Sequence, residues 1–189
     1  MSHMKTVIIC GVARSGKTTL AKMLGDQLGY SVVCTDDLVG PFHHSFEELG
    51  ISHADEFKTS ESIARFLHNY FYTLSKNKAF NYIIEGYYMF PQDMAKFKHR
   101  DDFEIVYLAY PKLTAKQIFD AIRKNDNKDD WTFAVPDEFL MARCEIFEKI
   151  SKMIEEDCKK FGFAFYDVSS DRETVLKYVK NMLIKNLIS

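Results

Sequence analysis

The 189-residue sequence lacks any apolar run near the roughly 20 residues that a membrane-spanning helix needs, so it predicts no membrane segment. The N-terminal residues also predict no signal peptide, because the apolar stretch Thr6 to Cys10 is short and is followed closely by glycine and arginine. We therefore expect a cytoplasmic protein that does not act at a membrane. Met1-Ser2-His3 before Met4 has the character of a cloning remnant and is set aside.

The sequence has no excess of one charge, because 25 Lys and Arg stand against 27 Asp and Glu, a formal net charge of -2. No overall basic field is available to attract nucleic acid, and we expect no nucleic-acid partner. No cysteine pair has C-x-x-C spacing, which argues against zinc and thioredoxin-like sites. A chain of this length builds a core without disulfides, so reduced and mostly buried thiols are expected. The cysteines are Cys10, Cys34, Cys144 and Cys158.

The sequence shows no internal repeat, low-complexity segment or linker, which favours one domain over residues 1–189. Short apolar runs predict strands, and amphipathic patterns between them predict helices. Because the two kinds alternate, we expect an α/β fold with a mainly parallel sheet and helices on both faces. The expected strands are 6–10, 31–34, 80–84, 103–109 and 163–168; the expected helices are 16–29, 60–74, 114–122, 136–161 and 170–183.

Three polar residues are the expected helix caps: Ser60, Thr114 in Thr114-x-x-Gln117, and Ser170 in Ser170-x-x-Glu173. Residues 38–58 show no clean period, and Gly40-Pro41 is interpreted as a chain break.

The segment from Gly11 to Thr18 matches the phosphate-loop motif G-x-x-x-x-G-K-[ST] and lies between an apolar strand and an amphipathic helix. Its glycines allow main-chain N–H groups to converge on phosphate oxygens, and the following helix adds its positive dipole end. The motif predicts Lys17 on the β- and γ-phosphates and Thr18 as a Mg²⁺ ligand. The expected nucleotide-binding residues are Gly11, Ala13, Arg14, Ser15, Gly16, Lys17, Thr18 and Thr19. Arg14 either touches phosphate or is a solvated surface charge.

Acidic residues follow two of the predicted strands at the edge where α/β sheets bind ligands. Asp36 and Asp37 come after the second strand, and Glu85 comes after the third. A kinase needs hard oxygen ligands for magnesium and a hydrogen-bond acceptor for the attacking hydroxyl. We interpret Asp36 as the acceptor-side base, Asp37 as an acceptor contact, and Glu85 as a ligand to magnesium water or to the acceptor. The alternative is that these are ordinary turn residues, and which aspartate is the base stays open.

The segments GVARSGKTT, VVCTDDLVGPF and YIIEGYY together resemble the P-loop small-molecule kinases, the group of nucleoside monophosphate, uridine and nicotinamide riboside kinases. The phosphate loop is the specific part of this resemblance, and Leu38 departs from it where an aromatic residue is often found. The resemblance implies a three-layer P-loop NTPase fold with a five-stranded parallel sheet of order 2-3-1-4-5. It also implies ATP and Mg²⁺ as cofactors, acceptor recognition by residues 38–80, and a mobile lid between the fourth and fifth strands.

The candidate lid, residues 123–135, contains Arg123, which is the expected catalytic cation for the transferring phosphoryl group. Arg143 lies on an otherwise apolar helix stripe, so it needs a partner, and an acceptor or phosphate contact is the expectation. The plainer alternative for these arginines is that they have no role in transfer, because the run around Arg123 also contains acidic residues and is then only a solvated loop. Trp131 either stacks on adenine or anchors this loop.

Histidines 43, 44, 53 and 68 show no metal-ligand spacing and are interpreted as ordinary. Aromatic residues around positions 42–88 suit either an acceptor pocket or the core.

The function predicted is an ATP- and Mg-dependent kinase of a small molecule; the alternatives are a nucleotide-dependent switch or ATPase with a protein partner, or a regulatory ATP-binding module. No D-x-x-G segment follows the third predicted strand, which argues against a GTPase. The acceptor, the choice of ATP or GTP, and the oligomeric state are not predicted.

Overall fold

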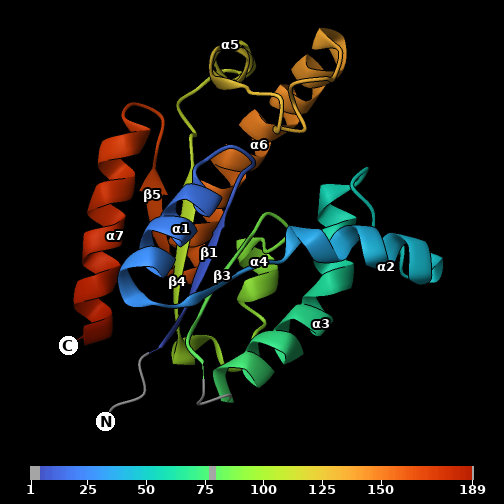
Figure 1. Ribbon diagram of the computed structural model, residues 1–189. Helices are drawn as coiled ribbons and strands as arrows, with labels where there is room; N and C mark the ends of the chain where they lie inside the picture. Colours follow the sequence, from blue (N-terminus) through green and yellow to red (C-terminus); the bar gives the residue numbers. More distant parts are fainter. Residues whose placement is uncertain (1–4, 77–79, 189) are drawn as a thin grey trace.

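A computed structural model of the protein describes residues 5–76 and 80–188, so the interpretation of Met1-Ser2-His3 lies outside the described residues. Its centre is one sheet of order β2-β3-β1-β4-β5 in which every neighbouring pair is parallel (Figure 1). This confirms the expected sheet. The strands are β1 (Thr6–Gly11), β2 (Ser31–Cys34), β3 (Tyr82–Gly86), β4 (Phe103–Ala109) and β5 (Ala164–Asp167).

Helices cover both faces of the sheet and complete the three layers. The longer ones are α1 (Lys17–Leu28), α3 (Glu56–Lys76), α5 (Ala115–Asn125), α6 (Asp137–Phe161) and α7 (Arg172–Ile188). α1 and α7 contact each other on one face, and α6 packs on β4 and β5 from the other with α4 (Pro91–Met94) beside it. α5 lies against α6 beyond the sheet edge, so the chain after β4 rises above the carboxyl ends of the strands (Figure 1).

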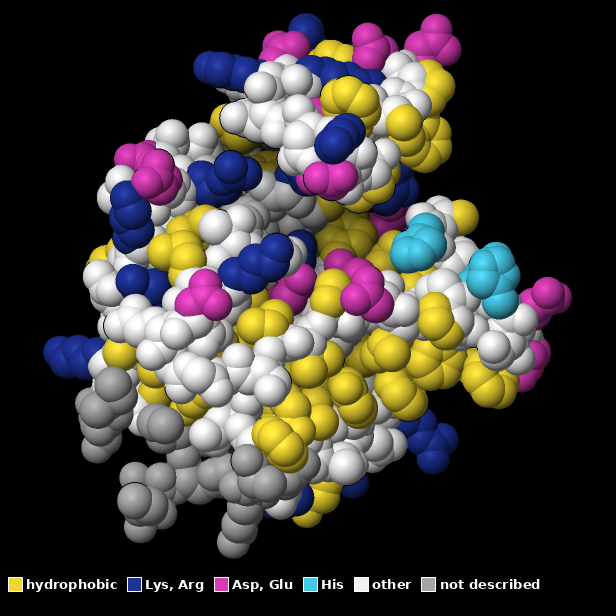
Figure 2. Space-filling model, viewed as in Figure 1, with side chains coloured by type: hydrophobic (Ala, Val, Ile, Leu, Met, Phe, Trp, Pro, Cys, Tyr) yellow, Lys and Arg dark blue, Asp and Glu magenta, His cyan; other side chains and the backbone are white. Residues whose placement is uncertain are grey.

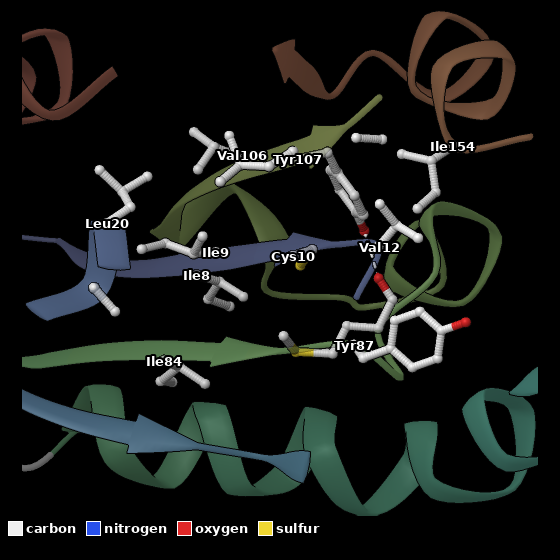
Figure 3. Packing of buried hydrophobic residues seen from close by; sticks show 14 of the residues in the cluster. Ile8, Ile9, Cys10, Val12, Leu20, Ile84, Tyr87, Val106, Tyr107 and Ile154 are labelled. Atoms are coloured by element: carbon white, nitrogen blue, oxygen red, sulfur yellow. Dashed lines mark hydrogen bonds between the residues drawn. The ribbon is translucent and has the colours of Figure 1, made fainter. Parts of the chain in front are cut away.

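β1 is the central strand, and every residue in it is buried. Short β-branched and apolar side chains suit a strand that is covered on both faces. Figure 3 shows Ile8, Ile9 and Cys10 of β1 between Ile84 of β3 and Val106 of β4. The phosphate-loop motif therefore leaves the most enclosed strand of the sheet, which gives its first residue a fixed position.

Tyr107 of β4 is a polar residue in this core, and its hydroxyl donates to the main-chain carbonyl of Met89 at 2.9 Å (Figure 3). A buried hydroxyl needs such a partner because an unpaired one costs free energy. The bond ties the centre of the sheet to the segment that follows β3, which also lines the cavity described below.

Several predicted boundaries are wrong. Ser60 does not cap a helix: α3 begins at Glu56, and Ser60 lies inside it, buried, with its hydroxyl donating to Asp93. Gly40-Pro41 does not break the chain, because both residues lie in α2 (Val39–Ser45), where proline in the first turn removes no needed hydrogen bond. The third strand is Tyr82–Gly86, so Glu85 lies within the strand, one residue before its end, instead of following it.

Of the two proposed capping boxes, the one at Thr114 and Gln117 is confirmed with both reciprocal hydrogen bonds. The one at Ser170 is wrong, because α7 begins at Arg172 and Asp171 accepts from the main-chain N–H of Thr174. An aspartate one position closer to the helix is an equally good cap, and spacing alone did not separate the two. Among the described residues, no helix is long and apolar enough to cross a bilayer.

Candidate active site

The loop from Gly11 to Thr18 has the backbone that a phosphate cradle requires. Gly11 and Gly16 have φ of 145° and 100°, a region that L side chains rarely adopt. A Cβ on Gly11 would stand 2.0 Å from the carbonyl oxygen of Leu108, so no larger residue fits where the end of β1 lies beside β4. α1 begins at Lys17, and its first-turn N–H groups have no intrahelical acceptor. The loop and helix end thus form an anion-binding concavity.

Lys17 is almost fully buried at the floor of this loop, where its ammonium donates to the carbonyl of Val12 at 3.1 Å. It also lies 5.9 Å from the ring centroid of Tyr87, which follows β3. A lysine held here is a fixed positive charge between the phosphate loop and the end of β3. Ser15, also in the loop, has a buried hydroxyl without a hydrogen-bond partner in the described part of the chain.

Thr18 and Glu85 meet across the site, because the Thr18 hydroxyl donates to Oε1 of Glu85 at 2.9 Å. Glu85 is the penultimate residue of β3 and is buried, so the sheet fixes its carboxylate beside the first turn of α1. A hydroxyl and a carboxylate oxygen at one point are the donors that Mg²⁺ prefers. The two residues predicted for magnesium are therefore brought together, and their chemistry fits that ion.

Asp36 lies in the short 3-10 turn after β2 and points toward the same place. Its Oδ1 accepts from the main-chain N–H of Tyr87 at 2.7 Å. Burial raises the pKa of the Asp36 carboxyl above its ordinary value, although nearby Lys17 opposes that rise. Asp37 is exposed at the rim of the cavity. Of the two, Asp36 has the fixed orientation and perturbed pKa that a base for an acceptor hydroxyl needs.

These groups border one cavity of about 1170 Å³ at the carboxyl edge of the sheet. Figure 2 shows the surface hollowed below the lobe that carries α5, with charged side chains gathered along the hollow. The cavity brings together most of the predicted site residues, namely Ala13, Arg14, Gly16, Lys17, Thr18, Thr19, Asp36, Asp37, Glu85 and Arg143.

Arg14, at the crest of the phosphate loop, is neither free nor simply solvated. Its guanidinium pairs with Asp130 at 2.5 Å and with Asp126 at 3.1 Å, and both belong to the candidate lid. Arg14 has a positive φ of 62°, which is uncommon for a residue with a side chain. The phosphate loop is therefore joined directly to the lid, a contact that the sequence did not indicate.

Arg123 lies away from the cavity lining and is occupied within the lid. Its guanidinium donates to Asp137 and to the carbonyls of Thr132 and Val135, and the shortest N–O distance to each of the three residues is 2.7 Å. In this arrangement it holds the loop between α5 and α6 together. This geometry does not support its predicted catalytic role, because its guanidinium is held by the loop, by Asp137 of α6 and over the Phe119 ring of α5, and it does not line the cavity.

Arg143 does border the cavity, but its partner is Glu56 at the start of α3, not a phosphate. The expectation that a charge on this apolar stripe needs a partner is correct, and the partner was missed. Glu56 sits in the segment without a readable period, so no signal distinguished it from a surface glutamate.

Arg143 belongs to a wall of the cavity that we call the acceptor wall, made of Tyr87, Tyr88, Phe139, Arg143 and Phe147. The Tyr87 ring stands edge-on to Tyr88 and Phe147, with centroids 4.9 and 6.2 Å away. His53 joins it by a 2.9 Å hydrogen bond to the Tyr88 hydroxyl. Tyr87 and Tyr88 are largely buried, whereas Phe139 is 52% exposed. The sequence left open whether such aromatics were pocket or core, and here they are both.

Comparison with known proteins adds the fold class. No family model matches the chain, and no curated protein matches its sequence. Solved structures do match over nearly the whole chain. A shikimate kinase from Bacteroides thetaiotaomicron is 18% identical, with 96% of this chain and 99% of that chain covered and a TM-score of 0.54. A shikimate kinase from Acinetobacter baumannii, in complex with shikimate, is 10% identical, with coverages of 98% and 96% and a TM-score of 0.55.

A deoxyadenosine kinase from M. mycoides, with products dCMP and dCDP bound, is 17% identical, with coverages of 95% and 99% and a TM-score of 0.51. The sheet order and these matches define one class: the protein has the fold of the P-loop small-molecule kinases. This chain also has the phosphate-loop motif itself, and Lys17, Thr18 and Glu85 lie in or beside that loop.

Proposed function

We propose that this protein is a kinase that transfers the γ-phosphoryl group of Mg-ATP to a hydroxyl of a small molecule. The observation that carries the proposal is the joining of three parts in one cavity: the phosphate loop, the Thr18–Glu85 pair and the Asp36 carboxylate. A phosphate loop alone serves many functions, but a positioned carboxylate beside it serves an attacking hydroxyl. The small-molecule acceptors in the names of the matching kinases support the same reading.

In this proposal the main-chain N–H groups of the loop and the Lys17 ammonium bind the triphosphate. Thr18 and Glu85 hold the metal, directly or through its water, and magnesium supplies positive charge against the charge that develops on the phosphates. Asp36 orients the acceptor hydroxyl and accepts its proton. The loop of residues 126–135 covers the donor side and excludes water. A cytoplasmic location and ATP as the donor fit this role and stay predictions.

The test is a set of two measurements on purified protein. Mg-ATP binding is measured by calorimetry, and ADP formation is measured with and without candidate hydroxyl compounds. A kinase releases ADP slowly alone and much faster with its acceptor. A response to a protein partner and to no small molecule would favour the nucleotide-dependent switch instead.

Lys17→Ala is the matched variant for the donor site. Losing a charge-assisted bond of about 1.5–3 kcal/mol should weaken triphosphate binding by roughly 10- to 100-fold. Turnover should fall with it, because the same charge serves the transferred phosphoryl group. Lys22→Ala, an exposed change on the same helix α1, is the control. Unaltered ATP affinity in Lys17→Ala would contradict the assignment of the phosphate loop.

A further inference from the structure

Glu56 is a buried acid, only 4% exposed, that lies behind the acceptor wall and does not itself line the cavity. We call the part of the cavity bordered by that wall its acceptor half. Its carboxylate forms an ion pair with Arg143, whose side chain is 15% exposed. Two opposite charges held together with so little water offset each other strongly. Arg143 is therefore not a free cation for an acidic substrate, although it borders the cavity.

The other charges in this half are negative. Asp36 and Asp37 both border the cavity beside the acceptor wall. Lys17, Arg14 and Arg172 are the other described cations that border it, and they lie toward the phosphate loop. Arg14 is held by Asp126 and Asp130, and Arg172 donates to the carbonyl of Arg14. With Arg143 offset by Glu56, the acceptor half has a surplus of negative charge.

The acceptor wall also presents aromatic surface to the cavity. Phe139, Arg143 and Phe147 are spaced by four on α6, so they share one face of that helix. The Arg143 guanidinium lies 5.3 Å from the Phe147 ring centroid, and Tyr87 stands across from Phe147. Phe139 borders the cavity and is more than half exposed, so part of its ring is accessible to a ligand. Flat apolar walls with a few polar groups suit a planar ring.

We propose that Glu56 sets the charge selectivity of the acceptor site, so that the acceptor is an uncharged hydroxyl compound with a planar ring, the chemical class of nucleosides. Phosphorylated or carboxylated compounds are rejected, because their anion would face Asp36 and Asp37 without a free cation. The inference rests on the proposed kinase function and narrows its substrate. In the transfer step the acceptor oxygen bonds to the γ-phosphorus, the bond to the β–γ bridging oxygen breaks, ADP leaves, and the hydroxyl proton passes to Asp36.

The first experiment compares matched pairs of acceptors with wild-type protein and Mg-ATP. Each pair is a nucleoside and its 5′-monophosphate, and shikimate and gluconate serve as carboxylated hydroxyl compounds without an aromatic ring. Product is identified by mass spectrometry and rates by ADP release. We expect a nucleoside to be the better substrate of its pair by about tenfold or more in kcat/KM, since like charges across a site are strongly disfavoured. Binding of each compound is measured in parallel with a non-hydrolysable ATP analogue present.

The second experiment uses Glu56→Gln, which frees the Arg143 charge. We expect the preference for the nucleoside over its monophosphate to shrink or reverse, by about tenfold. Glu61→Gln, an exposed acid on the same helix, should leave the preference as in wild type. Because an unpaired buried arginine can unfold the protein, Glu56→Gln with Arg143→Gln is the second variant, and it should keep the preference for the uncharged compound.

The outcomes separate the two proposals. Failure of Mg-ATP to bind would overturn the kinase function itself. Normal ATP binding with faster transfer to a monophosphate or a carboxylated compound would leave the kinase and overturn the charge selectivity. Failure of every uncharged ring compound both to bind and to react would also overturn it, as would an unchanged preference in folded Glu56→Gln.

Discussion

Burial has two opposite effects on Asp36: it fixes the orientation of the carboxylate, which suits the proposed base, and it destabilises the ionised form that the base needs. Its carboxylate is oriented by the Tyr87 N–H and lies near Lys17. We expect Asp36→Asn to lower transfer by about 10²- to 10⁴-fold, the usual contribution of a positioned base, with Mg-ATP affinity nearly unchanged. Acceptor-dependent ADP release and calorimetry measure the two parts. Asp37→Asn at the exposed rim is the control, and equal losses in both would leave the base unassigned between them.

The same residue gives a pH dependence whose sign follows from its pKa. Burial raises the pKa of folded Asp36 above the 3.8 of a free carboxyl, so its ionised form costs stability at neutral pH. That cost is lost as the pH falls through the raised pKa. Asp36→Asn should therefore raise the thermal midpoint more at a pH above the raised pKa than at a pH below it. Wild-type transfer should fall as the pH is lowered through that pKa, because Asp36 gains its proton. A midpoint gain that grows as the pH is lowered would contradict the raised pKa.

Gly86 shows how closely the end of β3 approaches Asp36. A Cβ there would stand 1.9 Å from Oγ1 of Thr35 and 3.1 Å from Oδ1 of Asp36. Gly86→Ala should displace the carboxylate and lower kcat/KM by about tenfold or more, since a shift near 1 Å costs roughly 10²-fold at a reacting group. ATP affinity should change little. Gly40→Ala, where an added methyl meets nothing within 4 Å, should lower transfer far less, and a reversed order would contradict this account.

Arg123 joins the two ends of the segment between α5 and α6. Arg123 reaches Asp137 and two main-chain carbonyls across this segment. Arg123→Ala removes hydrogen bonds worth about 1.5–3 kcal/mol, so amide exchange over residues 126–135 should be roughly 10- to 100-fold faster. Lys124→Ala, exposed and one residue on, is the control. A loss of transfer with unchanged exchange would instead restore the predicted catalytic role of Arg123.

Elements with a strong local pattern were predictable, and contacts between distant elements were not. β1, the phosphate loop and α1 follow from β-branched residues, two glycines and one amphipathic period. The pairings Thr18–Glu85, Arg14–Asp130 and Glu56–Arg143 join residues 67 or more positions apart, and charge alone does not name the partner. The segment holding α2 was missed because a seven-residue helix shows too few turns for a period.

For the whole molecule, the hydrogen bond from Tyr107 to the carbonyl of Met89 joins the core of the sheet to the segment that carries Tyr87 and Tyr88 of the acceptor wall. Tyr107→Phe leaves the buried carbonyl of Met89 unpaired, so the free energy of unfolding should fall by about 1–3 kcal/mol. Denaturant unfolding measures this. Tyr178→Phe, 63% exposed, should change it by no more than about 0.5 kcal/mol. A neutral result for Tyr107→Phe would mean that water or a rearranged main chain satisfies that carbonyl.

The stripe of Phe139, Arg143 and Phe147 lies on a single 25-residue helix, whereas the donor side is built from the loop after β1 and the segment 126–131. If the protein is the kinase proposed above, the surface that selects the acceptor can change by substitution at every fourth position of α6, while the backbone that binds the triphosphate stays the same. Related chains could then differ in acceptor and keep one transfer chemistry. Phe139, Arg143 and Phe147 are therefore the first positions to randomise in a search for altered acceptor selectivity, and Arg143 among them pairs with Glu56.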